Sequence, residues 1–386
     1  MNVPPWCRAK AQANRAVRAP PMCRKPVGDG AKRVRTVGSG MVRGGVGACA
    51  PGGGKAPILV DGSRRGPRPA TRPLPRRPPR GLAGGPAAWL ATRYHGRMIT
   101  TSSWQGLETL LIDTGLARCE IALYGAQVLS FVPRSDGRDL LWCSSSRLEP
   151  GRPVRGGVPV CWPWFAKQDR PADAAQHGFV RRMTWRVVTC AERPDGQVRV
   201  VLQVAAPPEG WPDGLGWPQA CSPALELLVG DALQMSLRTV NESEAPVTLT
   251  QALHTYFRVG DVRQAGVEGL QGLRFLDKLR EFAEFGQDVE WTFEGACDRI
   301  YLRSGPRHRI IDPVLGRSIL VESRHSSSTV VWNPGAEGIG ALGDVPLADW
   351  YQYLCVEAGN CAPLDRVTLG PGEETTLVQR ISALPL

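Results

Sequence analysis

The chain has 386 residues, of which 42% are hydrophobic and 22% are charged, so it contains enough apolar material for a sizeable core. Its net charge of +11 is uneven: residues 1–97 hold 20 Lys/Arg and 2 acidic residues, which leaves 27 basic and 34 acidic residues, a net of −7, for residues 98–386. No run approaches the ~18–20 apolar residues that span a membrane, and no secretory signal pattern is present, so we expect a cytoplasmic protein.

Residues 1–97 are rich in Gly, Pro and Arg, as in Thr71–Arg80 (TRPLPRRPPR), and show neither helical nor strand periodicity. Such a segment cannot bury enough apolar surface to offset its chain entropy, so we predict a disordered extension. It is interpreted as a solvated tail, as the result of a start assigned upstream of Met98, or as a nucleic-acid-binding arm. The scarcity of aromatic residues makes nucleic acid an unlikely partner, and the Gly and Pro content argues against an amphipathic transit peptide.

From about Thr101 the sequence shows strand signals instead. Arg118–Pro133 alternates apolar and polar residues around a Gly-Ala break, and Gly230-Asp231 between two apolar runs indicates a hairpin. Further strands are predicted over 196–205, 225–229, 233–239, 247–256, 308–311, 318–322, 329–332 and 375–381. Only Leu347–Tyr353 has a helical pattern. Short strands without intervening helices predict an all-β, mostly antiparallel sandwich over residues 98–386.

The eleven cysteines form no C-x-x-C pair and no zinc-ligand spacing. Cys143, Cys161, Cys190, Cys221 and Cys355 lie in or beside apolar runs, as is typical of buried free thiols. The chain also lacks a complete phosphate-binding Gly-rich loop. We therefore expect neither a metal nor a cofactor.

Two histidines and two carboxylates are candidates for acid–base chemistry. His177 follows a loop expected over Lys167–Ala175, and His254 ends an apolar strand. Glu357 lies on an otherwise apolar strand, where a carboxylate is costly unless it is paired or functional. Asp298 is expected just before another strand. Alone, each histidine is more simply a hydrogen-bonded residue at a strand end; together, these groups suit the reversible opening of a cyclic hemiacetal, which needs only proton carriers.

Arginines lie beside these candidates. Arg155 precedes the Gly156–Phe165 segment, and Arg181 follows His177 by four residues. Exposed arginines near loops are often simply solvated, but next to a candidate catalytic histidine they favour an anionic substrate group, because guanidinium binds phosphate through paired hydrogen bonds. Nearby aromatic side chains either stack on a sugar ring or fill the core; they are Trp162, Trp164, Phe165, Phe179, Tyr256 and Trp332.

The motifs together resemble the aldose 1-epimerase superfamily, and specifically its hexose-6-phosphate (glucose-6-phosphate) 1-epimerase branch. The similar segments are Gly125–Phe131, Arg155–Phe165, Gln176–Arg181 with Trp185, Leu253–Phe257, Asp298–Tyr301, Val331–Gly335, Cys355–Gly359 and Leu369–Glu373. They cover nearly all of Met98–Leu386 and none of residues 1–97. Two departures are the Glu357-Ala-Gly sequence, where the family often has Pro, and a Gly-rich segment after Asn333-Pro334.

The resemblance implies a galactose-mutarotase-like β-supersandwich and an isomerase that interconverts sugar anomers without a cofactor. It implies that Glu357 is the general base and His254 the general acid, with His177 and Asp298 holding the sugar. Arg155, Arg181 and Gln176 would bind the 6-phosphate, and Trp332 would contact the sugar. Expected alternatives are a mutarotase of unphosphorylated aldoses or a non-catalytic sugar-binding protein. A monomer is expected.

Overall fold

The alternation in the sequence builds three large antiparallel sheets. The computed structural model describes residues 92–94, 97–167, 174–207, 209–211, 216–361 and 365–386, so the extension predicted for residues 1–97 lies almost entirely outside the described residues. The first sheet has the order β1-β2-β3-β4-β5, with bounds Thr92–Tyr94, Arg97–Trp104, Leu107–Asp113, Ala117–Ala122 and Gln127–Pro133. The Gly-Ala break expected in 118–133 separates β4 from β5, and both Gly125 and Ala126 have positive φ.

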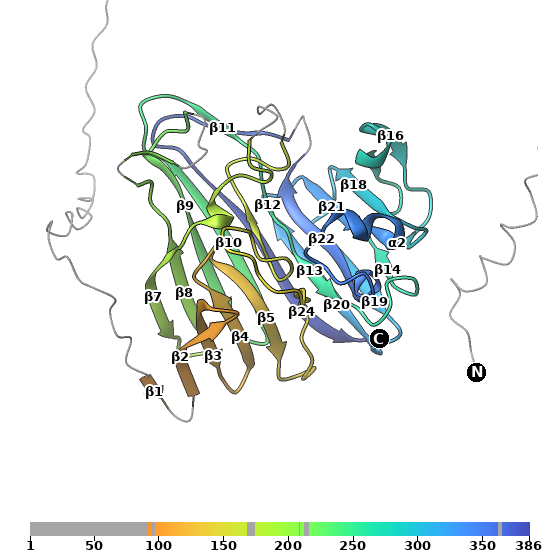
Figure 1. Ribbon diagram of the computed structural model, residues 1–386, viewed down its shortest axis with the longest axis horizontal. Helices are drawn as coiled ribbons and strands as arrows, with labels where there is room; N and C mark the ends of the chain where they lie inside the picture. Colours follow the sequence, from red (N-terminus) through yellow and green to blue (C-terminus); the bar gives the residue numbers. More distant parts are fainter. Residues whose placement is uncertain (1–91, 95–96, 168–173, 208, 212–215, 362–364) are drawn as a thin grey trace, which may run out of the picture. The chain divides into compact units, whose positions relative to one another are not determined.

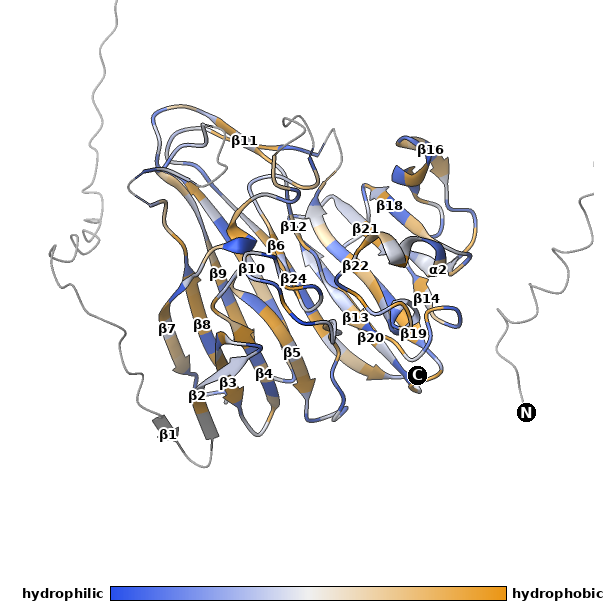
Figure 2. Cartoon of the chain, viewed as in Figure 1, coloured by the Kyte–Doolittle hydropathy of each residue, from blue (hydrophilic) through white to orange (hydrophobic). Residues whose placement is uncertain are grey.

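The largest sheet has nine strands in the order β17-β14-β19-β20-β24-β10-β9-β8-β7 (Figure 1). Their bounds are Trp291–Thr292, Gly266–Glu268, Arg307–Asp312, Arg317–Arg324, Glu374–Pro385, Ala232–Asn241, Cys221–Val229, Val198–Gln203 and Arg186–Glu192. Buried and partly exposed positions alternate along β9 and β10. In Figure 2, blue segments lie among orange ones on the neighbouring strand β8. The predicted hairpin at Gly230-Asp231 joins these two strands, with Val229 opposite Leu233.

The third sheet has the order β16-β15-β18-β21-β22-β12-β6, and β13 also pairs with β22. The bounds are Ala283–Gly286, Arg274–Asp277, Cys297–Leu302, Ser328–Asn333, Tyr353–Asn360, Gln251–Leu253 and Val160–Cys161, with β13 at Tyr256–Arg258. A small two-stranded sheet joins β11 (Val247–Leu249) to β23 (Val367–Leu369). Every residue of β22 is buried, because this strand is covered on both faces.

The second and third sheets are tied together beneath β22. The side chain of Gln379 on β24 donates a hydrogen bond to the carbonyl of Val356 on β22 at 3.1 Å and accepts one from the hydroxyl of Thr255. Gln379 and Thr255 are fully buried. Because a buried amide left without partners is costly, these bonds hold β22 in one position over β24.

Helical structure in the described residues is short. The helices are η1 (Val180–Arg182), η2 (Lys278–Arg280), α2 (Gly335–Gly338), η3 (Ile339–Ala341) and η4 (Trp350–Gln352). The helical pattern at Leu347–Tyr353 is realised as η4, whereas α2 and η3 occupy the Gly-rich segment and were not predicted. None of the described helices is long and apolar enough to cross a membrane.

Two strand predictions were wrong in detail. The run 247–256 is not one strand but is divided among β11, β12 and β13, because Thr250 leaves the ladder and its hydroxyl accepts a hydrogen bond from the amide of Phe165 at 2.8 Å. Asp298 does not precede a strand: it is the second residue of β18. The cysteines in the described residues are all free, as expected, and Cys143 and Cys190 are only partly buried.

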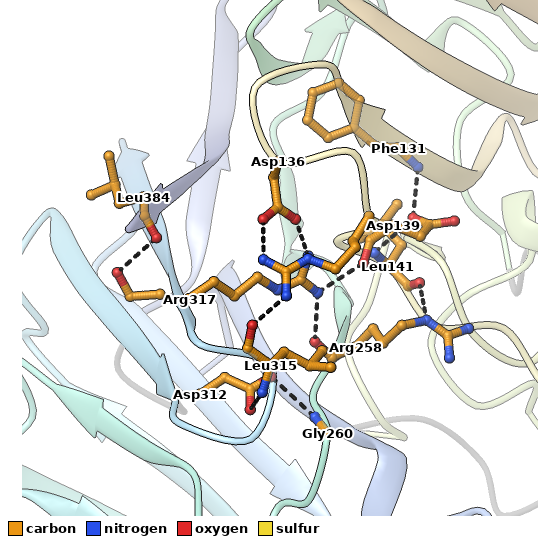
Figure 3. A network of polar contacts seen from close by, with 12 residues as sticks. Phe131, Asp136, Asp139, Leu141, Arg258, Gly260, Asp312, Leu315, Arg317 and Leu384 are labelled. Carbon is orange, nitrogen blue, oxygen red and sulfur yellow. Dashed lines mark hydrogen bonds and ion pairs between the residues drawn. The ribbon is translucent and has the colours of Figure 1, made fainter. Parts of the chain in front are cut away.

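A buried arginine links the loop after β5 to β13 and β20 (Figure 3). The side chain of Arg317 is 1% exposed and donates to Asp136 at 2.5 Å and to the carbonyls of Asp139 and Arg258 at 2.8 and 3.2 Å. Burial raises the pKa of Asp136, but hydrogen bonds from Arg138 and Arg317 outweigh it and bring the pKa below its ordinary value. The carboxylate therefore stays charged opposite Arg317.

We expect Arg317→Met to lower the free energy of unfolding by about 3–5 kcal/mol, because it leaves a buried carboxylate and two buried carbonyls short of a donor. Urea unfolding at pH 7 measures this loss. Arg307→Met is the matched control: Arg307 lies on the adjacent strand, its side chain is 70% exposed, and its ion pair with Glu322 should contribute about 1 kcal/mol or less. Equal losses in the two variants would contradict the structural role given to Arg317.

Candidate active site

A pocket of about 200 Å³ opens over β22. All eight site residues expected from the sequence line it: His254, Glu357, His177, Asp298, Arg155, Arg181, Gln176 and Trp332. Phe165, Lys278, Val330 and Leu342 complete the lining. Residues as far apart in the chain as Arg155 and Glu357 thus meet in one cavity with several ionisable groups, which is the arrangement expected of a catalytic site.

Glu357 and His254 face each other at the buried end of the pocket. Glu357 lies on β22 and is 1% exposed; His254 directly follows β12, and its backbone amide donates to the carbonyl of Pro159 at 3.0 Å. Nδ1 of His254 lies 3.2 Å from Oε1 of Glu357, yet neither atom makes an aligned hydrogen bond. Both carboxylate oxygens of Glu357 are buried without a hydrogen-bond partner in the structure. Buried polar atoms without partners are costly, so they indicate groups whose hydrogen-bond partner is a bound substrate.

The charges of this pair are set mainly by burial. Burial raises the pKa of Glu357 well above its ordinary value, with Lys278 acting in the opposite direction and Asp298 in the same direction. Burial, followed by the positive charges of Arg155 and Arg181, lowers the pKa of His254. The pair therefore holds one proton near neutral pH, and burial places that proton on Glu357 in the free protein.

His177 is held by a backbone that only a glycine neighbour permits. It has φ of 62°, and Gly178 follows with φ of 70°; a Cβ at Gly178 would lie 1.8 Å from the carbonyl oxygen of Trp162. Nδ1 of His177 accepts a hydrogen bond from the amide of Ala166 at 3.2 Å, so the neutral ring carries its hydrogen on Nε2. Burial, then the charge of Arg181, lowers the pKa of His177 and keeps it neutral. The loop expected at 167–175 lies largely outside the described residues.

The two arginines of the pocket differ in how their charge is balanced. Nε of Arg155 donates to both carboxylate oxygens of Asp344 at 3.0 and 3.1 Å, and Nη1 donates to the hydroxyl of Tyr256 at 3.0 Å. Arg181 donates to the carbonyl of Gln176 at 2.6 Å, while its buried Nε has no partner. Among the residues that the structure describes, no carboxylate pairs with Arg181, and burial lowers its pKa.

Aromatic rings form the walls of the pocket. Tyr256 stacks on the ring of His254 with centroids 4.9 Å apart, and Trp332 meets His254 edge-on at 5.9 Å. Trp332 remains partly exposed, as a sugar-contacting ring should, whereas Tyr256 is fully buried. Trp162, Trp164 and Phe179 belong to the main hydrophobic core. For these three, filling the core was the correct alternative.

One set of side chains in the described part of the chain has the chemistry of a metal site. Ligand atoms of His254, Cys355 and Glu357 lie within 4.8 Å of one another. Burial raises the pKa of Cys355 well above its ordinary value, so its thiol is protonated at neutral pH. A divalent cation bound there would occupy both proton carriers of the pocket.

Comparison with known proteins decides the family. The family model described as aldose 1-epimerase matches residues 108–382. The chain belongs to the aldose 1-epimerase family. It is accordingly a carbohydrate epimerase, an isomerase that acts on a sugar, and the galactose-mutarotase-like fold expected from the sequence is confirmed.

Several relatives of this epimerase have names that specify a substrate. A protein of Escherichia coli (strain K12) named "Putative glucose-6-phosphate 1-epimerase" is 34% identical over 68% of this chain and 86% of its own length. A protein of Cenchrus ciliaris with the same name is 32% identical over 72% of this chain and 86% of its own length. A crystal structure described as a "putative mutarotase" from Salmonella typhimurium superposes with a TM-score of 0.67 and 28% identity, over 75% of this chain and 94% of that one.

Sequence reasoning missed Lys278, the third cation of the epimerase pocket. Its Nζ lies 2.7 Å from Oδ2 of Asp298 and 5.4 Å from the ring centroid of Phe165. No motif marks it, because it follows β15 in a short helix whose sequence is otherwise that of a solvated turn. The signal that could have found it is a lone lysine directly after an alternating strand that ends in Asp277, a residue suited to cap a helix.

Proposed function

We propose that this epimerase interconverts the α and β anomers of a hexose 6-phosphate, with glucose 6-phosphate as the type substrate. The observation that carries the proposal is Arg181, a cation of the pocket with a buried, unpartnered Nε and no carboxylate partner among the described residues. A phosphate would supply the missing negative charge through paired hydrogen bonds. The names of the relatives at 32–34% identity support the same substrate.

Glu357 and His254 carry the proton transfers in this proposal. The Glu357 carboxylate removes the proton from the anomeric hydroxyl, the bond between C1 and the ring oxygen breaks, and protonated His254 gives its proton to the ring oxygen. The open aldehyde rotates about the C1–C2 bond. His254 then takes the proton back as the oxygen attacks the other face of C1, and Glu357 returns its proton to the new anomeric hydroxyl. The pair holds one proton, and the cycle begins after that proton has moved from Glu357 to Nδ1 of His254, which lies 3.2 Å from Oε1.

The remaining pocket residues hold the substrate. His177 donates from Nε2 to a sugar hydroxyl, and Asp298 accepts a hydrogen bond through Oδ1, which is buried and unpartnered. Trp332 offers a ring face to the sugar. Gln176 lies beside Arg181 in the phosphate subsite, and Arg155, already oriented by Asp344 and Tyr256, adds positive charge on the other side.

Anomer exchange of glucose 6-phosphate, followed by NMR saturation transfer on the full chain, tests the proposal. We expect exchange well above the spontaneous rate for the phosphate and little acceleration for glucose or galactose at the same concentration. Acceleration for the free sugars alone would keep the proton chemistry but refute the phosphate subsite. No acceleration of any of these sugars would favour a non-catalytic sugar-binding protein.

A further inference from the structure

Lys278 lies at the pocket wall in a short turn that is capped by Asp277. It is the first residue of η2, whose capping residue Asp277 accepts a hydrogen bond from the amide of Leu279 at 3.0 Å. The carbonyl of Asp277 accepts a second bond from Phe282 at 2.9 Å and closes the turn. The hydrogen bonds of the turn do not involve the lysine side chain, which is only 17% exposed.

The strand register places Lys278 beside Asp298. Asp277, at the end of β15, pairs with Arg299 of β18, so the residue after Asp277 and the residue before Arg299 are neighbours. Nζ of Lys278 contacts Oδ2 of Asp298 at 2.7 Å and lies over the ring of Phe165 at 5.4 Å from its centroid. Both side chains of the ion pair are only 17% exposed, which strengthens their attraction relative to a pair in open water.

The contact with Lys278 fixes one carboxylate oxygen of Asp298 and leaves the other without a partner. Oδ2 is held by Lys278, whereas Oδ1 is buried and has no hydrogen-bond partner. A carboxylate with one oxygen fixed cannot rotate away, so its second oxygen has a defined direction into the pocket. That is the geometry required of an acceptor for a sugar hydroxyl.

The same lysine is the cation that balances two buried carboxylates. Asp298 on β18 and Glu357 on β22 flank β21 and line one pocket. Asp298 pairs with Lys278, but Arg155 is already neutralised by Asp344, and Arg181 lies in the phosphate subsite. Without Lys278, Asp298 would lose its ion pair, and each of the two carboxylates would favour protonation of the other.

We propose that Lys278 is a positioning residue of the epimerase: it orients Asp298 and supplies the counter-charge that lets Asp298 and Glu357 carry negative charge in the same pocket. The inference deepens the proposed function, because it rests on Glu357 as the base and Asp298 as a sugar-binding group. In this proposal Lys278 contacts no reacting atom and acts only through the two carboxylates.

The other ionisable groups around Glu357 should not mask the effect of Lys278 on the pH profile. Burial lowers the pKa values of His254 and His177, and Arg155 and Arg181 stay charged, so none of these side chains by itself changes charge near neutral pH. Burial raises the pKa values of the remaining neighbours, which are therefore neutral over the same range; these are Tyr256, Cys161, Cys355 and Cys361. The proton shared by Glu357 and His254 and the proton of Asp298 are what titrates.

The sign of the effect follows from the contacts. Lys278 lowers the pKa of Glu357 and that of Asp298, in both cases against burial. Lys278→Met should therefore raise both pKa values, so that a smaller fraction of the enzyme has an anionic base at a given pH. Activity would be lost on the acid side and recovered on the alkaline side. A role limited to packing would lower activity equally at every pH.

The test is the pH profile of kcat/KM for glucose 6-phosphate in the full chain, beside a direct titration of Glu357. We expect Lys278→Met to move the acid limb up by at least about one pH unit, which is about a tenfold loss at a fixed pH on that limb. Lys278→Arg, which keeps the charge, should shift it by less than about 0.3 unit. An unshifted limb in the Met variant, or an equal shift in the Arg variant, would overturn the inference.

The direct titration separates this inference from the proposed function. Carbon-13 NMR of glutamate carboxyl groups reports Glu357 without any turnover, and the signal is assigned by its loss in Glu357→Gln. We expect its titration midpoint to rise in Lys278→Met by about the same amount as the acid limb. An unchanged midpoint would refute the role of Lys278 whatever the activity. If instead the wild type failed to accelerate exchange while the midpoint rose, the proposed function would fail and the charge balance would stand.

Discussion

Glu357→Gln should lower kcat/KM for anomer exchange by about 10²–10⁴-fold, the contribution of a positioned general base. The amide keeps the shape of the carboxyl group and removes its ability to accept the anomeric proton. His254 would also lose the anion that stabilises its protonated form at 3.2 Å. Exchange measured by NMR saturation transfer at pH 7 gives the loss directly. Turnover close to that of the wild type would refute Glu357 as the base.

The same variant should be no less stable than the wild type. Because the pKa of Glu357 is raised by burial, the folded state binds its proton more tightly than the unfolded chain does. The wild type therefore loses stability, relative to the glutamine variant, as pH rises from the ordinary glutamate pKa through the raised one. Urea unfolding at pH 5 and pH 8 should show the difference growing in favour of Glu357→Gln. A variant that is less stable at both pH values would mean that its inactivity reports damage to the fold.

A neighbouring substitution controls for disturbance of β22. Cys355 lies two residues from Glu357 on the same buried strand and is not among the proposed proton carriers. Cys355→Ala removes one sulfur atom and should retain exchange within about tenfold of the wild type. A loss as large as that in Glu357→Gln would show that packing of β22, rather than the carboxylate, limits the reaction.

Arg181→Ala should raise the KM for glucose 6-phosphate by about 30-fold or more, because loss of a buried charge-assisted contact costs about 2–5 kcal/mol. The free protein should lose little stability, since the side chain makes one hydrogen bond to the carbonyl of Gln176 and no ion pair with a described residue. Michaelis curves for glucose 6-phosphate measure the effect. An unchanged KM for the sugar phosphate would refute the phosphate subsite.

The chain offers matched controls for this prediction. Arg182 is adjacent in η1 but does not line the pocket, so Arg182→Ala should leave the KM within about twofold of the wild type. Arg181→Lys keeps the charge but loses the paired donors of guanidinium, and we expect an intermediate KM. If Arg182→Ala raised the KM as much as Arg181→Ala did, general surface charge rather than a defined subsite would attract the phosphate.

Much of the fold could be predicted because strand formation here is local. Burial alternates along β9 and β10, the two apolar runs that the sequence predicted as a hairpin. Gly125-Ala126 marks a turn with positive φ, which needs residues tolerant of unusual backbone angles. The division of 247–256 into three strands was missed. It depends on where Thr250, His254 and Thr255 find partners in distant segments, and no local pattern carries that information.

The candidate site residues could be chosen from the sequence, because a carboxylate on an apolar strand is an exceptional position and the family resemblance pointed to the two histidines. All of those candidates line one pocket. The protonation states of Glu357 and His254 could not be predicted from the sequence. That Glu357 and His254 share a proton depends on burial and on a 3.2 Å separation, and both exist only once β12 and β22 pair.

The amino-acid sequence by itself determined the all-β class, the positions of several strands (β9, β10 and β20 among them) and most of the chemically capable side chains, because these follow from periodicity and residue type along a short stretch of chain. The tertiary structure alone decided which charges are balanced. Arg155 meets Asp344 across 189 residues of sequence, Lys278 meets Asp298 through the register of β15 and β18, and Arg181 meets no described carboxylate. Electrostatic energy depends on distance and desolvation in space, and neither quantity is encoded in the spacing of residues along the chain.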